Sequence, residues 1–405
     1  MTYFFYSLLF SYFIIYFFNV ILGNGFSIDF LNHFSSIDDS IKGKIDVCNL
    51  FRLGDSINPP WTNSPGFLSF KITPELWKLG ARTTISTKES AALIEEIITC
   101  ANMYFDFICK PKQQEKRLKM QEDEHLYLKA YSELLSYLRH LFIYYNELVS
   151  QKSLENFVQS DSSWGWLKFF KKIHMEKKFE RIVFVTYNYD IWLERLLTIF
   201  DIPYSIYGFD NPQDSIVEII KPHGSISFVP QEESLSNYGI NYSLNFEDLP
   251  LEDFKIQFEN LDSASRGAMI PPAGDSGRLH NTDTWAKTLR ERAEEAAKAI
   301  ESNDNVILCG LSYGYVDRKE LDGILLNLNQ ECNFTFINPN PPRDLNAVLM
   351  TIFRNYVLCQ GMVNFNMKDT IGRGIRKVFT ERQKSKVIIS SLCLRNKVYS
   401  FFGIV

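Results

Sequence analysis

Five apolar segments of this chain each end in a short cluster of glycine, amide, hydroxyl or imidazole groups. In α/β proteins such clusters follow buried strands at the edge where ligands bind. The imidazole of His223 can take up a proton near neutral pH, and the amide of Asn188 can orient a water molecule without adding charge. The segments are VILGNGFS (20–27), VFVTYNYD (183–190), IIKPHGS (219–225), ILCGLSYG (307–314) and FTFINPN (334–340).

Each cluster also has a purely structural interpretation. Gly23 and Gly25 can form a tight turn, or they can let a pyrophosphate approach backbone N–H groups at a helix start. The polar residues of TYNYD can cap a helix that begins near Trp192. A single histidine such as His223 is usually structural, but this one lies between a proline and a glycine, where nothing indicates a core position. The polar residues of GLSYG and INPN are consistent with ordinary turns.

Helical patterns separate several of these apolar segments, which indicates crossover connections and a mainly parallel sheet. We therefore predict an α/β, doubly wound, Rossmann-like fold. In such a sheet the ligand binds outside the carboxyl ends of the strands, where the strand order switches. All five clusters should line that edge, and their recurrence is a stronger argument than any single motif.

The remaining sequence divides around this sheet. Residues 85–172 contain long stretches with apolar residues at helical spacing, which predicts a helical insertion within a domain spanning 19–365. The segment 231–265 is acidic and irregular, as expected of a surface excursion. A further helix should start near Trp285 with Asp283 as its cap. The tail 366–405 is basic, lacks a strong period and indicates no function.

Composition excludes some classes of protein. With 43 basic and 48 acidic residues, the net charge of −5 argues against a dominant basic face for nucleic acid. The seven cysteines are scattered, and none forms a CxxC pair, so neither a zinc ribbon nor a disulfide framework is indicated. Scattered thiols of this kind suit a reducing cytoplasm.

The first 18 residues form an apolar extension without charged side chains. Residues 1–22 approach the length of a membrane span, so membrane association is a minor alternative. Two observations oppose it. The segment lacks the basic start and the small-residue cleavage site of a secretory signal. Residues 19–22 are also expected to form the end of a strand, which cannot lie in the sheet and in lipid together. A mis-set translation start and a packed or oligomer-contact segment remain alternatives.

Taken together, LGNGFS, TYNYD, KPHGS, GLSYG and INPN, in this order, resemble the sirtuin superfamily. They are most similar to the sirtuin-like NAD-consuming effectors of bacterial anti-phage defence, which the MIPPAG stretch at Met269 also resembles. The resemblance covers residues 19–338 in outline. Within this resemblance, the pair of motifs TYNYD and KPHGS is specific, whereas the glycine motifs are less specific.

The resemblance implies a role for each cluster. Asn188 and His223 would be catalytic, with Asn188 at the nicotinamide ribose or the attacking water and His223 as general base. Asp190 would lie near the nicotinamide carboxamide. The other NAD-binding residues would be Gly23, Asn24, Gly25, Phe26, Ser27, Gly224, Gly310, Ser312 and Asn338.

Two departures from the family pattern matter. Sirtuin deacylases carry a zinc module of paired CxxC motifs, which this sequence lacks, so no zinc is expected and the acyl-lysine cleft is in doubt. Asn24 stands where sirtuins usually have alanine, a change that a phosphate turn tolerates. The expected function is therefore hydrolysis of NAD, as substrate, to nicotinamide and ADP-ribose. The alternatives are a protein deacylase or ADP-ribosyltransferase, or a non-catalytic sensor of NAD or ADP-ribose.

The resemblance further implies a cytoplasmic abortive-infection effector that depletes NAD. Such effectors are usually gated by assembly or by a partner. A homo-oligomer is expected, with a separate activator such as an Argonaute, a HerA-type ATPase or a phage protein. The helical insertion is a candidate assembly surface, and no direct nucleic-acid binding is expected.

Overall fold

The computed structural model describes residues 16–62, 66–109, 126–160, 164–175, 179–210, 215–231, 239–240, 242, 249–272, 284–314 and 318–359. Its centre is a seven-stranded parallel sheet with the strand order β3-β4-β2-β1-β7-β8-β9. The chain places β2, β3 and β4 on one side of β1, with β3 at the edge, and then crosses to β7 on the other side. The expected doubly wound, parallel α/β fold is confirmed, and its topological switch point lies between β1 and β7. The strands of this sheet are β1 (Tyr16–Leu22), β2 (Phe179–Thr186), β3 (Tyr204–Ile206), β4 (Val217–Ile220), β7 (Asn305–Cys309), β8 (Asn333–Ile337) and β9 (Asn355–Cys359).

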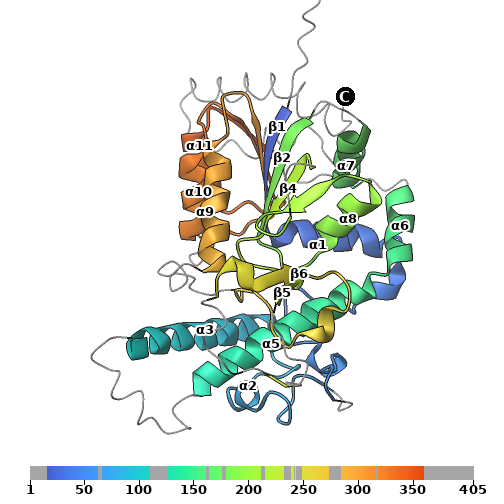
Figure 1. Cartoon of the computed structure of the whole chain (residues 1–405), viewed down its shortest axis with the longest axis vertical. Coiled ribbons are helices and arrows are strands. Elements are labelled where there is room, and N and C mark those ends of the chain that lie inside the picture. The colour runs from blue at the N-terminus through green and yellow to red at the C-terminus, as the bar shows by residue number, and fades with distance from the viewer. Residues whose placement is uncertain are drawn as a thin grey trace, which may run out of the picture.

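Helices cover both faces of the sheet, which explains why its strands are apolar on both sides. In Figure 1, α9, α10 and α11 lie against one face, whereas α1, α7 and α8 lie against the other. The helices are α1 (Asn24–Ser35), α2 (Pro74–Lys78), α3 (Thr87–Cys109), α5 (Leu126–Leu148), α6 (Gln151–Gln159), α7 (Gly165–Met175), α8 (Trp192–Ile199), α9 (Trp285–Lys298), α10 (Arg318–Asn327) and α11 (Arg343–Ile352).

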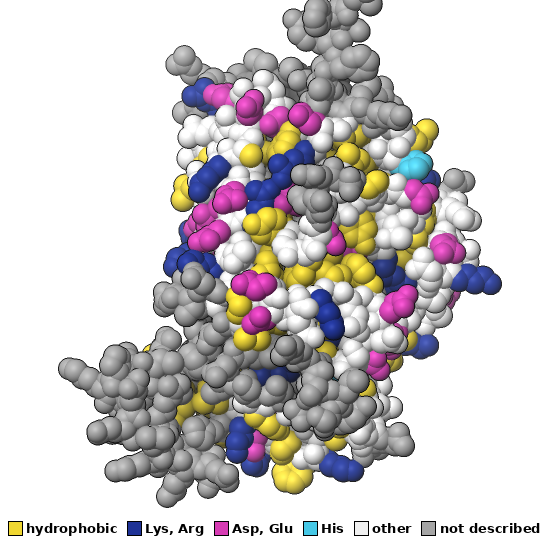
Figure 2. Space-filling view, in the orientation of Figure 1, with side chains coloured by type: hydrophobic (Ala, Val, Ile, Leu, Met, Phe, Trp, Pro, Cys, Tyr) yellow, Lys and Arg dark blue, Asp and Glu magenta, His cyan; other side chains and the backbone are white. Residues whose placement is uncertain are grey.

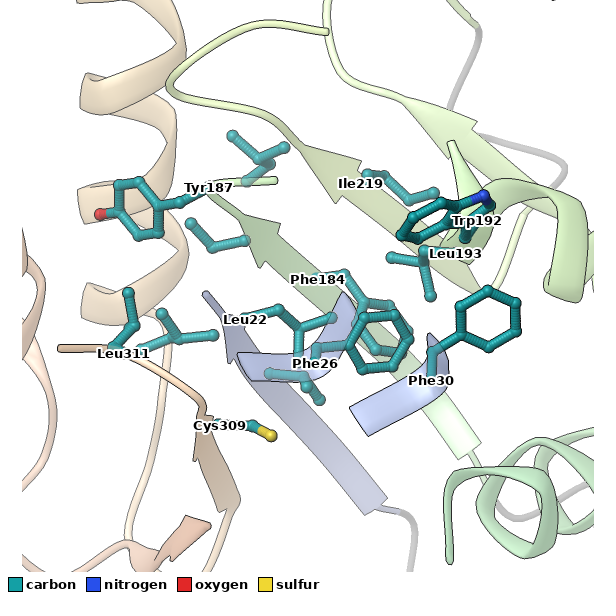
Figure 3. Close-up of a cluster of buried hydrophobic side chains, with 14 of the residues drawn as sticks. Leu22, Phe26, Phe30, Phe184, Tyr187, Trp192, Leu193, Ile219, Cys309 and Leu311 are labelled. Atoms are coloured by element: carbon teal, nitrogen blue, oxygen red, sulfur yellow. The ribbon is translucent and has the colours of Figure 1, made fainter. Parts of the chain in front are cut away.

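The core between the sheet and α1 is strongly aromatic. Figure 3 shows Phe26 and Phe30 of α1 beside Phe184 of β2 and Trp192 of α8. The rings of Phe30 and Trp192 are 5.2 Å apart. Such contacts fix the orientation of α1, and therefore of the turn that precedes it.

The register places the carboxyl ends of the central strands at one level. Leu22 at the end of β1 pairs with Thr186 of β2 and with Cys309 of β7. Cys309 pairs in turn with Ile337, the last residue of β8. The polar segments that follow these strands therefore begin side by side along one edge of the sheet.

A second layer lies beyond that edge. Figure 1 shows the short strands β5 (Phe228–Pro230) and β6 (Phe254–Ile256) there, followed by α5, α3 and α2. Arg139 of α5 is fully buried and donates to the carbonyls of Ile226, Leu261 and Ala264. Arg139 therefore links the helical layer, by hydrogen bonds, to the segment of the chain that follows β4.

The structure differs from the sequence expectations at several elements. The short strands β3 and β9 were not expected, and part of the segment predicted to be irregular forms β6. Helix α9 begins at Trp285 as expected, but Thr284 caps it by accepting a hydrogen bond from the Lys287 amide. Asp283, the expected cap, lies outside the described residues.

The amino-terminal segment is described only from Tyr16 onward. Residues 16–18, which were assigned to the apolar extension, belong to β1, and Phe18 pairs with Ile182 and Asn305 on the two neighbouring strands. Among the described residues, no helix is long and apolar enough to cross a membrane. Residues 1–15 and the tail 366–405 lie outside the described part of the chain.

Candidate functional site

The turn between β1 and α1 is held against the end of β7. The amides of Gly23 and Gly25 donate to the carbonyls of Cys309 and Gly310 at 2.9 and 3.0 Å. A Cβ atom on Gly25 would lie 2.4 Å from the Cα of Gly310, so this close approach of two backbones alone requires glycine. The two glycine amides therefore have partners within the protein. Asn24, between them, is exposed.

The side chain of Phe26, a residue that the resemblance assigns to cofactor binding, lies in the core. Its ring is buried and packs 5.7 Å from the ring of Trp164 and 5.3 Å from that of Trp166. The Phe26 side chain is therefore part of the core, because the helical face that it occupies points toward α7.

Ser27, Asn188 and Asp190 form one buried hydrogen-bonded group. The Ser27 hydroxyl donates to Oδ2 of Asp190 at 2.6 Å, and Nδ2 of Asn188 donates to the Ser27 hydroxyl at 2.9 Å. Asp190 also accepts from the Trp192 amide at 3.2 Å, so it caps α8 as the structural interpretation proposed. The role at the nicotinamide carboxamide that the resemblance implies for Asp190 stays a prediction.

Lys221 connects this group to the segment after β4. Its ammonium is fully buried and donates to the Asp190 carbonyl at 2.6 Å and to Oε1 of Glu194 at 2.7 Å. Burial raises the pKa of Asp190 above its ordinary value of 3.8, while the charge of Lys221 and the Ser27 hydroxyl oppose that rise. Lys221 thus fixes the TYNYD and KPHGS segments relative to each other.

His223 belongs to a second group. Its Nε2 atom lies 3.1 Å from Oε2 of Glu320, and Oε1 of Glu320 lies 2.8 Å from the guanidinium of Arg290. The imidazole also contacts the ring of Tyr187 edge to face, with 4.8 Å between centroids. In Figure 3 the Tyr187 side chain points away from Phe26 and Trp192, toward the helices of the opposite face.

Gly224 has a structural reason to be glycine. Its φ of +79° is in the left-handed region, and a Cβ atom would lie 1.9 Å from the Ala268 carbonyl oxygen. The residue forms an antiparallel bridge with Met269. The Ile270 amide donates to the His223 carbonyl at 3.0 Å, so the start of the MIPPAG segment lies beside KPHGS. Residues 273–283 are not described.

The third part of the edge lies after β7 and β8. Gly310, at a φ of +68°, donates its amide to the Ile337 carbonyl at 3.0 Å. Nδ2 of Asn338 donates to the Leu311 carbonyl at 3.1 Å, which joins the two turns. Ser312 is exposed, like Asn24 across the switch point. These two are the most accessible polar side chains of the predicted set.

The predicted residues therefore share one edge of the sheet but form separate groups. Asn188 bonds to Ser27 of α1 on one face, whereas His223 bonds to Glu320 of α10 on the other (Figure 1). Tyr187 links the groups, because it precedes Asn188 in the chain and contacts His223. Sequence reasoning missed Lys221, Glu194, Glu320 and Arg290. Only Lys221 carried a signal, as a charged residue directly after the buried strand IVEII.

The charges in and around the site are mixed. On the face shown in Figure 2, basic and acidic side chains of the described residues are interspersed. Within the described ranges, no three His, Cys, Asp or Glu residues are placed to hold a metal ion. No model of a known protein family matches the chain, and no curated protein matches it.

Proposed function

We propose that this chain is a sirtuin-like NAD hydrolase that binds NAD across the carboxyl edge of the sheet. One observation supports this more than any other. The carboxyl ends of β2, β1, β7 and β8 are in register, and the segment after each carries polar groups beside the switch point between β1 and β7. Parallel sheets of this topology bind nucleotides at that position.

In the proposed complex the adenosine half of NAD lies over the ends of β7 and β8, beside Ser312 and Asn338. The nicotinamide riboside half lies over the ends of β2 and β4. Because the amides of Gly23 and Gly25 have protein partners, the phosphates would be held by exposed groups such as Asn24 and Ser312. In this complex Gly23 and Gly25 contribute to the site by allowing the turn after β1 to pack closely against the turn after β7.

The reaction breaks the bond between the ribose C1′ atom and the nicotinamide nitrogen. The bonding electron pair goes to that nitrogen and neutralises the positive charge of the ring. A water oxygen bonds to C1′, and the water proton passes to His223 and then to solvent. A positioned general base of this kind contributes about 10²–10⁴-fold to the rate.

Asn188 and Asp190 suit the remaining tasks. The Asn188 amide orients the water or a ribose hydroxyl without adding charge, and the Asp190 carboxylate accepts a hydrogen bond from the carboxamide of the leaving nicotinamide. The proposed biological role is depletion of NAD on infection, in a homo-oligomer gated by a separate activator. That role is supported by resemblance only.

The test incubates the purified full chain with NAD and follows nicotinamide and ADP-ribose by chromatography. We expect release without an added acyl-lysine peptide or acceptor protein, and a loss of at least about 10²-fold in Asn188→Ala and His223→Ala. The exposed residues Asn156 and His174 supply matched controls, and Asn156→Ala and His174→Ala should retain activity.

Calorimetric titration of NAD into the same proteins separates the alternatives. Release that depends on an acylated peptide indicates a deacylase, and release that depends on an acceptor protein indicates a transferase. Binding without turnover is the result expected of a sensor, or of a hydrolase whose activator is absent. An absence of both binding and turnover contradicts the proposed function.

A further inference from the structure

We infer that Glu320 is a positioning residue that fixes the neutral imidazole of His223 with its proton on Nε2, so that Nδ1 is the nitrogen that accepts a proton. The tautomer follows from the geometry of these side chains. The statement that Nδ1 acts as the base rests on the proposed function.

Glu320 has a buried cation beside it. Its carboxylate lies 2.8 Å from the guanidinium of Arg290, and both side chains are buried. Arginine remains protonated in proteins, and an adjacent cation favours the ionised form of a carboxyl group. Glu320 is therefore a carboxylate with two acceptor oxygens and no proton to donate.

The other oxygen of Glu320 faces the imidazole of His223. Nε2 lies 3.1 Å from Oε2 of Glu320. Because an ionised carboxylate only accepts, the histidine must donate, and its proton must be on Nε2. A neutral imidazole carries one proton, so Nδ1 then has the lone pair.

The imidazole of His223 is held rigidly by its surroundings. The side chains of His223 and Glu320 are 7% and 4% exposed, so water competes little for their hydrogen bond. The edge-to-face contact with Tyr187 restricts rotation of the imidazole from another direction. Glu320 and Arg290 lie on α10 and α9, which pack against each other. Helices α9 and α10, on the face opposite α1, thus determine the orientation of the His223 ring, which follows β4.

The test is ¹⁵N NMR of histidine-labelled full-length protein, which distinguishes the two neutral tautomers by the shifts of the ring nitrogens. The chain has six histidines, and the His223 signals are assigned by their loss in His223→Gln. We expect the Nε2–H tautomer in the wild type. An Nδ1–H tautomer, an even mixture or a doubly protonated ring up to about pH 9, well above the ordinary histidine range, would overturn the inference.

Variants of Glu320 identify the cause. In Glu320→Gln the side-chain carbonyl can still accept from Nε2, so the tautomer should persist. In Glu320→Leu/Arg290→Met the buried pair is removed together, which avoids leaving one charge unpaired, and the preference should disappear. Glu331→Gln, at a distant ion pair with Arg354, serves as the control. A preference that survives the double replacement would show that Glu320 does not fix the tautomer.

Turnover of NAD separates this inference from the proposed function. We expect the double variant to lose about 10²-fold in kcat with little change in KM, and Glu320→Gln to retain most activity. If no protein binds or turns over NAD but the NMR result holds, the proposed function fails and the positioning of His223 by Glu320 stands. If NAD is hydrolysed by a wild type in the Nδ1–H form, the inference fails alone.

Discussion

The single hydroxyl group of Ser27 forms hydrogen bonds with the side chains of both Asn188 and Asp190. It is buried in the first turn of α1, donates to the Asp190 carboxylate at 2.6 Å and accepts from the Asn188 amide at 2.9 Å. Among the described residues, Ser27 thus bridges these two side chains. We therefore expect the local arrangement of the TYNYD segment to depend on this serine.

Replacement of Ser27 by alanine should lower the free energy of unfolding by about 1–3 kcal/mol, because it leaves two buried polar groups without their partner. Urea denaturation measures this change. Ser312→Ala, at an exposed position on the same edge, should stay within about 0.5 kcal/mol of the wild type. Equal stability of the Ser27 and Ser312 variants would show that the network contributes nothing to folding.

For individual residues, what could be predicted from the sequence depended on how far apart along the chain the interacting residues lie. The polar strand ends were recognisable because each cluster is local, as in TYNYD or KPHGS. Glu320 was not recognisable, since its partner His223 is 97 residues away in the chain and nothing near Glu320 marks it. The glycines were assigned to phosphate binding, whereas the structure shows that the approach of Gly25 to Gly310 requires them in any case.

Helix α5 is the element that joins the helical layer to the site. Its Glu133 side chain is fully buried and accepts hydrogen bonds from the amides of Leu76 and Glu75 at 2.8 and 3.0 Å, at the start of α2. Burial raises the pKa of Glu133 from 4.5 to about 7, although these amides and the Tyr242 hydroxyl act to lower it. The attachment of α2 to α5 therefore depends on pH.

The sign of that dependence follows from linkage. Because the folded-state pKa is higher than the unfolded one, the contribution of Glu133 to stability is present below pH 4.5 and is lost as the pH rises through about 7. The loss amounts to at most about 3 kcal/mol. Urea denaturation across this range should show a shallower fall of stability with pH in Glu133→Gln, but not in the exposed control Glu259→Gln. Identical slopes in wild type and Glu133→Gln would contradict this account.

The long helices were predictable as elements because their apolar residues recur with helical spacing over many turns, as in α3 and α5. Short elements were not. Strand β3 has three residues, and β9 follows a helix without an intervening turn signal in the sequence. Their identity as strands comes from pairing with β4 and β8, which is a tertiary interaction.

For the whole molecule, sequence patterns predicted a parallel sheet but not the order of its strands. Strand order depends on pairings such as that of Leu22 with Thr186, between segments that are separated by the helices α1 to α7. That order places the switch point between β1 and β7, and hence Asn24 and Ser312 on either side of it. The location proposed for NAD therefore depends on the fold as well as on the motifs.

Hydrogen–deuterium exchange of the full chain with and without saturating NAD tests this location most directly, since it needs neither turnover nor an activator. Binding at the carboxyl edge should slow exchange in residues 22–27, 186–191, 309–314 and 337–340, which follow β1, β2, β7 and β8. Helix α6, whose outer face is exposed, should be unaffected. Unchanged exchange at all four strand ends, or protection confined to other segments, would contradict the assignment of this edge as an NAD site.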